Sequence, residues 1–248
     1  LVVAAPGVDR LPFFFPLEDI RVDDAPTRLD EIADAAYFVY GAPEGVGLYQ
    51  PIPPLQNQVV GALNRRDIMR RAWWMDDGFF SYDVYELNLD RRWVTPEIIG
   101  VATNDVIFGD FVHYLGYDIG GLELWPGRRL MMHLYWEVLK TPPEDYTIYI
   151  HLLDPEGNLV TAWDNPIARG DNEFYYSSLV WQPGEIIDDE RTLSLPSEPI
   201  PAGAGYRIVI GIYTSDDNMR VPATVNGEPG GDGYTLEYPI AILEEEPS

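Results

Sequence analysis

The sequence predicts an α+β protein, in which a small α/β region precedes an antiparallel β-sandwich of the jelly-roll or immunoglobulin-like kind. Two observations predict the sandwich. Apolar residues alternate with polar ones from Leu130 to Val138, which is the pattern of a strand with one buried face. Beyond residue 101, short apolar runs are separated by Gly- and Pro-containing turns, with no helical periodicity between them. We therefore expect an α/β domain over residues 1–100 and the sandwich over residues 101–248.

The first region is expected to begin with an extended, Pro- and aromatic-rich arm over Leu11–Pro26. Thr27 is expected to cap a helix, because apolar residues recur after it at helical spacing. The further expected elements are a strand, a second helix and a two-stranded hairpin: Tyr37–Tyr40, Leu55–Leu63, Ile68–Trp74 and Phe79–Leu87. No glycine-rich phosphate-binding motif occurs among them, so the sequence gives no indication of a nucleotide site.

In the second region we expect a meander, since the strands of Leu130–Trp163 are joined by turn-forming Pro, Asp and Gly residues. A long loop is expected from Asp164 to Asp189. The expected strands are Val106–Tyr117, Leu122–Leu124, Leu130–Val138, Tyr146–Leu153, Leu159–Trp163, Thr192–Leu195, Tyr206–Tyr213, Met219–Val221 and Tyr234–Leu243.

The chain is strongly acidic, with 41 Asp and Glu against 16 Lys and Arg and a formal net charge of -25. Such a charge repels phosphate backbones and anionic membranes, so we expect no nucleic-acid partner. There is no cysteine, which excludes disulfides and thiolate chemistry. No apolar run reaches the roughly 18–20 residues that span a bilayer. Leu1–Pro6 is apolar, however, and is interpreted as the trailing end of a removed signal or an upstream membrane anchor.

Candidate reactive residues give a weak signal. The three histidines, His113, His133 and His151, each fall inside an expected strand and are interpreted as structural. No Gly-x-Ser-x-Gly motif is present, and no catalytic residue is predicted. A structural Ca²⁺ is the only cofactor that we consider, because hard oxygen ligands in sandwich loops suit this ion. Its predicted ligands are Asp164, Asp188 and Asp189.

Aromatic residues supply the predicted ligand-binding site. Tyr175, Tyr176 and Trp181 flank a loop and offer rings on which sugars stack. The same loop carries hydrogen-bonding groups for sugar hydroxyls, on Arg169, Asp171 and Asn172. Core packing is the alternative interpretation of these rings.

The second region also resembles a known family. The motifs that carry the resemblance are LGYDI, PGRRLMMHLYWEV, DYTIYIHLLDPEGNLVTAWDNPIARG, WQPGEIIDDERTLSLP and AGYRIVIGIYTSDDNMRVP. They are similar to the soluble extracytoplasmic C-terminal region of bacterial polytopic glycosyltransferases of the dolichyl-phosphate-mannose–protein mannosyltransferase-like class. The resemblance extends over roughly Asp34 to Ile242. It implies an α/β segment followed by a β-sandwich, and it implies no catalytic residue here, because the catalytic membrane domain of that class is absent from this sequence.

These observations favour a non-catalytic, extracytoplasmic or cell-surface module that contacts a glycan or a surface protein. Two alternatives stay open. One is a structural subunit of a cell-surface assembly, in which the chain self-associates. The other is a glycoside hydrolase, which requires two carboxylates facing one another across a sugar.

Overall fold

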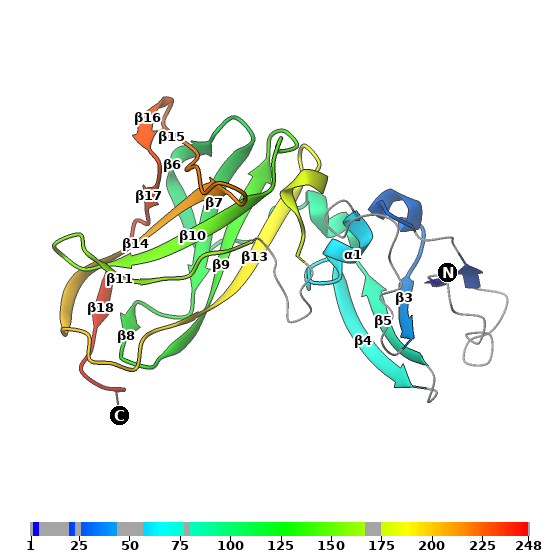
Figure 1. The fold of residues 1–248 in the computed structure, drawn as a ribbon, viewed down its shortest axis with the longest axis horizontal. Coiled ribbons are helices and arrows are strands. Elements are labelled where there is room, and N and C mark those ends of the chain that lie inside the picture. Colours follow the sequence, from blue (N-terminus) through cyan, green and yellow to red (C-terminus); the bar gives the residue numbers. More distant parts are fainter. Residues whose placement is uncertain are drawn as a thin grey trace. The chain divides into compact units, whose positions relative to one another are not determined.

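The computed structural model describes residues 2–4, 20–22, 26–43, 57–76, 80–166 and 175–247 (Figure 1). They form two compact units. The first comprises Leu1–Val94 and Arg169–Val180, and the second comprises Thr95–Ala168 and Trp181–Ser248. The division lies near the expected boundary at residue 100, but the sequence did not predict that a later segment belongs to the first unit. Most of the expected arm over Leu11–Pro26 lies outside the described residues.

The first unit contains one sheet with the strand order β2-β1-β3-β5-β4. Its strands are β1 Val2–Ala4, β2 Ile20–Val22, β3 Tyr37–Pro43, β4 Met69–Asp76 and β5 Phe80–Leu87. Strand β1 runs parallel to both its neighbours, whereas β3, β5 and β4 are antiparallel. The expected hairpin of β4 and β5 is therefore confirmed.

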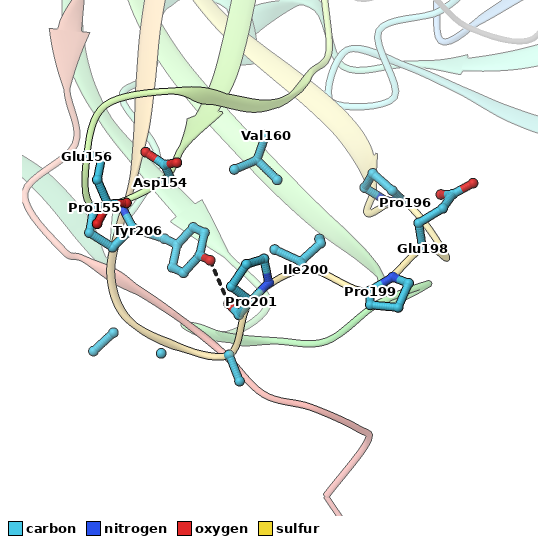
Figure 2. A pocket seen from close by; sticks show the side chains of 13 residues that line it. Asp154, Pro155, Glu156, Val160, Pro196, Glu198, Pro199, Ile200, Pro201 and Tyr206 are labelled. Carbon is cyan, nitrogen blue, oxygen red and sulfur yellow. Dashed lines mark hydrogen bonds between the residues drawn. The ribbon is translucent and has the colours of Figure 1, made fainter.

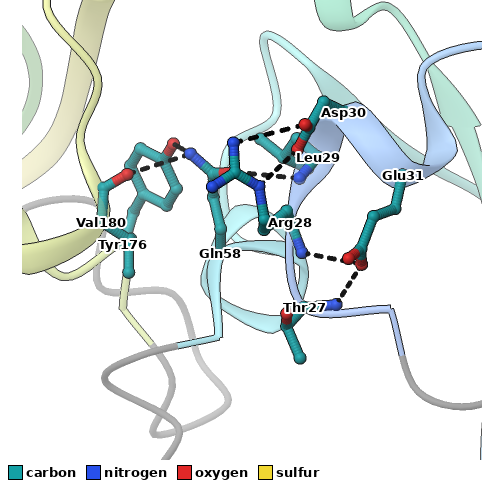
Figure 3. A network of polar contacts seen from close by, with 8 residues as sticks. All are labelled: Thr27, Arg28, Leu29, Asp30, Glu31, Gln58, Tyr176 and Val180. Carbon is teal, nitrogen blue, oxygen red and sulfur yellow. Dashed lines mark hydrogen bonds and ion pairs between the residues drawn. The ribbon is translucent and has the colours of Figure 1, made fainter.

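The described part of the first unit also contains four short helical turns: η3 Leu29–Ile32, α1 Gln58–Ala62, η5 Leu89–Trp93 and η6 Ser178–Val180. The residue that precedes η3 is Arg28, and not Thr27 as expected. The carboxylate of Glu31 instead accepts hydrogen bonds from the backbone N–H groups of Thr27 and Arg28, at 2.8 and 3.2 Å (Figure 3). Helix α1 begins later than expected, because Asn57 Oδ1 accepts the backbone N–H of Val60 at 3.0 Å and so caps the first turn.

The second unit contains two mainly antiparallel sheets. One has the order β13-β9-β7-β6-β15-β16. The other has the order β11-β10-β14-β18-β8, with β12 added to β10 and β17 added to β14. Their strands are β6 Gly100–Phe108, β7 Val112–Ile119, β8 Glu123–Leu124, β9 Arg129–Val138, β10 Tyr146–Leu153, β11 Leu159–Ala162, β12 Asn165–Pro166, β13 Ile186–Ser194, β14 Gly203–Thr214, β15 Ala223–Val225, β16 Glu228–Gly231, β17 Tyr234–Thr235 and β18 Ile240–Ile242.

The two sheets contact one another in a β-sandwich-like arrangement. The ring of Tyr114 on β7 lies 5.7 Å from that of Tyr234 on β17. Arg191 on β13 donates from Nη1 to the carbonyl oxygen of Ile148 on β10 at 3.3 Å. The second unit is thus a two-layered β structure, in agreement with the β-rich fold expected from the sequence.

The alternation in β9 is confirmed. Leu134 and Trp136 are fully buried, while His133 and Glu137 on the other face are partly exposed. The prediction of a meander is wrong for its first two strands, which do not pair with one another. Strand β9 pairs with β7 and β13, whereas β10 pairs with β14 and β11 in the other sheet. The connection after Val138 contains two consecutive prolines, and it changes sheets instead of closing a hairpin.

Three further expectations need correction. The single strand Val106–Tyr117 is a hairpin of β6 and β7, because Gly109 adopts a φ of 59° and turns the chain. The expected loop up to Asp189 already contains the start of β13. Met219–Val221 is no strand and contributes only a single bridge from Arg220 to Tyr213.

The sequence prediction also missed the hairpin of β15 and β16, although its turn is Asn226-Gly227 with φ values of 53° and 81°. Asn-Gly is the sequence favoured in such a two-residue turn. Among the residues that the structure describes, no helix is long and apolar enough to cross a lipid bilayer.

Candidate functional site

The structure buries one of the rings that the sequence assigned to sugar binding. Tyr176 is 0% exposed and lies in the part of the chain that returns to the first unit. Its hydroxyl accepts a hydrogen bond at 3.2 Å from Gln58 Nε2, which also donates to the carbonyl oxygen of Val180 at 3.0 Å (Figure 3). The guanidinium carbon of Arg65 lies 5.3 Å from the centre of the Tyr176 ring. Tyr176 is therefore a core residue, and its assignment as a stacking platform is wrong.

Trp181 is buried as well, at 2% exposure, and it belongs to the second unit. Tyr175 is partly exposed. The other three predicted ligand residues, Arg169, Asp171 and Asn172, lie outside the described residues. Of the three predicted aromatic residues, Tyr175 is partly exposed, whereas Tyr176 and Trp181 are buried.

The three aspartates predicted to bind Ca²⁺ form ion pairs instead. Asp164 Oδ1 lies 3.2 Å from His151 Nε2, and Asp188 Oδ1 lies 2.7 Å from His133 Nδ1. Asp189, on the opposite face of β13, is buried and pairs with Arg191 at 2.8 Å. Across the described part of the chain, no group of three or more His, Asp or Glu side chains is placed to hold a metal ion. The prediction that these three residues share one ion is corrected accordingly.

Strand β4 carries two neighbouring exposed aromatic side chains that were not among the predicted site residues. Trp73 is 41% exposed and Trp74 is 54% exposed. Because successive side chains of a strand point to opposite faces, the two rings lie on opposite faces of the sheet. The sequence did contain a signal for this arrangement, since two consecutive aromatic residues in a strand cannot both face the same core.

We define the Trp73 face by Tyr37, Arg70, Trp73 and Glu86. The ring centres of Tyr37 and Trp73 are 5.7 Å apart, with an angle of 49° between the planes. Arg70 and Glu86 are paired across β4 and β5, and both are exposed. A register shift between Arg71 and Trp73 brings Arg70 onto the same face as Trp73, although the two residues are three positions apart. Glu86 is in turn paired with Tyr37 on β3. The face therefore combines two tilted rings with one group that donates hydrogen bonds and one that accepts them.

The Trp74 face differs in its chemistry. Arg71 Nη2 forms an ion pair at 2.7 Å with Asp83, which is the residue opposite Trp74. Burial raises the pKa of Asp83, and Arg71 opposes this rise. Tyr85 is buried on the same face, and desolvation together with Asp83 raises its pKa to about 12. Arg71 and Asp83 on this face are thus paired with one another.

Comparisons with known proteins assign no family. No family model matches the sequence, and no curated protein matches it. Among solved structures, the C-terminal domain of Wzt is 11% identical, with a TM-score of 0.40 over 60% of this chain and 84% of that one. A CARDB domain from Pyrococcus furiosus, in complex with di-metal ions, is 11% identical, with a TM-score of 0.29 over 59% and 95%. A Bacteroides uniformis β-glucuronidase is 10% identical, with a TM-score of 0.30 over 61% and 21%. Similarities at this level do not identify a function for the chain.

Proposed function

We propose that this protein is a non-catalytic accessory module that contacts a glycan through the Trp73 face. The observation that carries the proposal is the exposed Trp73 ring beside that of Tyr37. The apolar C–H face of a pyranose stacks on such rings. Arg70 and Glu86 supply a donor and an acceptor for the hydroxyl groups at the edge of the same sugar.

The proposal includes the properties that the sequence resemblance implies. The chain then acts at an extracytoplasmic surface, as the accessory region of a membrane glycosyltransferase-like protein, and its second unit is a sandwich of the jelly-roll or immunoglobulin-like kind. The net charge of -25 favours a neutral or cationic glycan over an anionic one. A shallow face buries little area, so the expected Kd is on the order of micromolar to millimolar.

Trp73→Ala and Trp74→Ala provide the test, because the two residues are neighbours in the sequence and lie on opposite faces of one strand. A glycan array identifies a bound neutral polysaccharide, and titration calorimetry then measures its Kd for each variant. We expect Trp73→Ala to weaken binding by about tenfold. This change in Kd corresponds to about 1.4 kcal/mol, which is near the upper limit for one aromatic stacking contact. Trp74→Ala is expected to bind like the unchanged protein, and added salt is expected to have little effect.

An array without any bound glycan contradicts the proposal, as does an equal loss in both variants. The structural-subunit alternative predicts a different result. Strand β4 is the last strand in the order of its sheet, so self-association through this edge is expected to depend on Trp73 and Trp74 alike and to appear as a concentration-dependent mass in analytical ultracentrifugation.

A further inference from the structure

A groove in the second unit lies between the turn after β10 and the segment that connects β13 to β14 (Figure 2). Its volume is about 540 Å³. The residues that line it are Asp154, Pro155, Glu156, Val160, Pro196, Glu198, Pro199, Ile200, Pro201, Ala202, Gly203, Ala204 and Tyr206. Its walls are therefore aliphatic and proline-rich, and its charged side chains are all carboxylates.

The lining side chains offer hydrogen-bond acceptors and almost no donors. The only donor among these side chains is the Tyr206 hydroxyl, which donates to the carbonyl oxygen of Pro201 at 2.5 Å (Figure 2). The four prolines also have no backbone N–H. No Lys or Arg occurs among the described lining residues. A ligand that forms hydrogen bonds with these side chains must therefore supply the hydrogen-bond donors.

The carboxylates differ in how far they are already engaged. Both oxygens of Asp154 accept hydrogen bonds from Asn158, at 2.7 Å from the backbone N–H and 2.9 Å from Nδ2. These bonds lower the pKa of Asp154 and fix the turn. Glu156 and Glu198 are exposed, and Figure 2 draws them on opposite sides of the groove. They are the two carboxylates that an incoming cation meets.

The wall opposite the turn is rigid before any ligand binds. Pro196, Pro199 and Pro201 restrict the backbone of the connecting segment. Tyr206, which is 2% exposed, ties Pro201 in place through its hydroxyl. Burial, followed by the charges of Asp154 and Glu156, raises the pKa of Tyr206, so the hydroxyl keeps its proton and its role as a donor. Less conformational entropy is lost on binding to such a wall than to a mobile loop.

We propose that this groove binds an extended, basic segment of a partner protein, with a Lys or Arg side chain lying in the groove. The aliphatic stem of that side chain packs on Ile200 and the prolines, while its cationic head pairs with one of the two exposed carboxylates, Glu156 or Glu198. Charge complementarity with an acidic protein of net charge -25 supports the same partner. The proposal concerns a different unit and a different ligand from the Trp73 face, and it does not depend on glycan binding.

The test uses the full chain and a fluorescently labelled short peptide of alternating Lys and Pro residues. Fluorescence anisotropy measures its Kd for the unchanged protein, for Glu156→Gln/Glu198→Gln, and for the control Glu97→Gln/Glu228→Gln. Glu97 and Glu228 are exposed in the second unit but do not line the groove. Both double variants change the net charge equally. We expect the groove variant to raise Kd by about tenfold or more and the control to change it by about twofold or less.

Two further probes define the ligand. The same peptide with acetylated lysines keeps the stem and loses the charge, and we expect it not to bind. Spermine carries the charge without a peptide backbone, and we expect it to bind more weakly than the peptide. Equal losses in the two double variants, an undetectable interaction with the Lys/Pro peptide, or spermine binding as tightly as the peptide would each overturn the proposal.

Discussion

At the scale of single residues, the clearest feature of the second unit is the contact between its histidines and carboxylate side chains. Each of the three histidines lies beside at least one carboxylate: His113 beside Asp105 and Glu137, His133 beside Asp188, and His151 beside Asp164. The structure therefore places a carboxylate within 3.2 Å of each histidine. The interpretation of the histidines as structural residues, made from the sequence, is consistent with this arrangement.

His133 leads to a prediction about pH. The hydrogen bond to Asp188 raises the pKa of His133, and the charges of Glu190 and Asp118 act in the same direction, against a smaller opposing effect of burial. A histidine whose pKa is raised on folding stabilises the protein fully below its unfolded pKa, near 6.5, and this contribution is lost as the pH rises through the folded pKa. The partly exposed side chain limits the size of the effect.

We therefore expect His133→Gln to lower the free energy of unfolding more at about pH 5.5 than at about pH 8.5. Urea denaturation of both proteins at each pH measures the difference. Asp188→Asn is the matched comparison, because it keeps the histidine and removes the carboxylate that raises its pKa, so the same pH-dependent contribution is expected to be lost. A penalty for His133→Gln that is constant across this range, or larger at the higher pH, would contradict the assigned direction.

At the scale of elements, β9 organises the second unit because it is the strand between β7 and β13. Trp136 points inward from it, with ring centres 5.3 Å from Tyr114 and 5.9 Å from Phe108. Met131, on the outward face, is 49% exposed. A shift of register by one residue would exchange these two environments.

The alternation in β9 predicts opposite outcomes for two truncations in the same strand. Trp136→Ala is expected to lower the free energy of unfolding by about 3–5 kcal/mol, through lost burial and the cavity left behind. Met131→Ala is expected to change it by about 0.5 kcal/mol or less. Chemical denaturation measures both. The register would be wrong if Trp136→Ala proved as mild as Met131→Ala.

At the scale of the whole molecule, the first unit is completed by the segment Arg169–Val180, which interrupts the second unit in the sequence. Tyr176 is buried there by Gln58, and a Cβ on Gly61 would lie only 3.2 Å from its ring. A fragment that starts at Thr95 removes both of these neighbours. The segment Tyr175–Val180 then has nothing left to bury it within the first unit.

We expect chymotrypsin to cleave the fragment 95–248 after Tyr175 or Tyr176 much faster than it cleaves the full chain. The reason is that proteases require local unfolding, and the fragment loses the contacts that oppose it. Mass spectrometry of timed digests locates the cuts. Equal protection of this site in the fragment and the full chain would show that the contacts to Gln58 and Gly61 do not hold the segment.

The sequence by itself determined the β-rich class, the inward and outward faces of β9, the β4–β5 hairpin and the turn between β10 and β11. Each of these follows from local information, because alternation and turn residues act over a few neighbouring positions. Only the tertiary structure decided that β9 and β10 belong to different sheets, that Tyr176 is buried while Trp73 is exposed, and that the groove beside Tyr206 exists. Those outcomes depend on contacts between residues far apart in the chain, as between Gln58 and Tyr176. A period of two shows which side chains share a face, but it does not show which distant strand or helix covers that face.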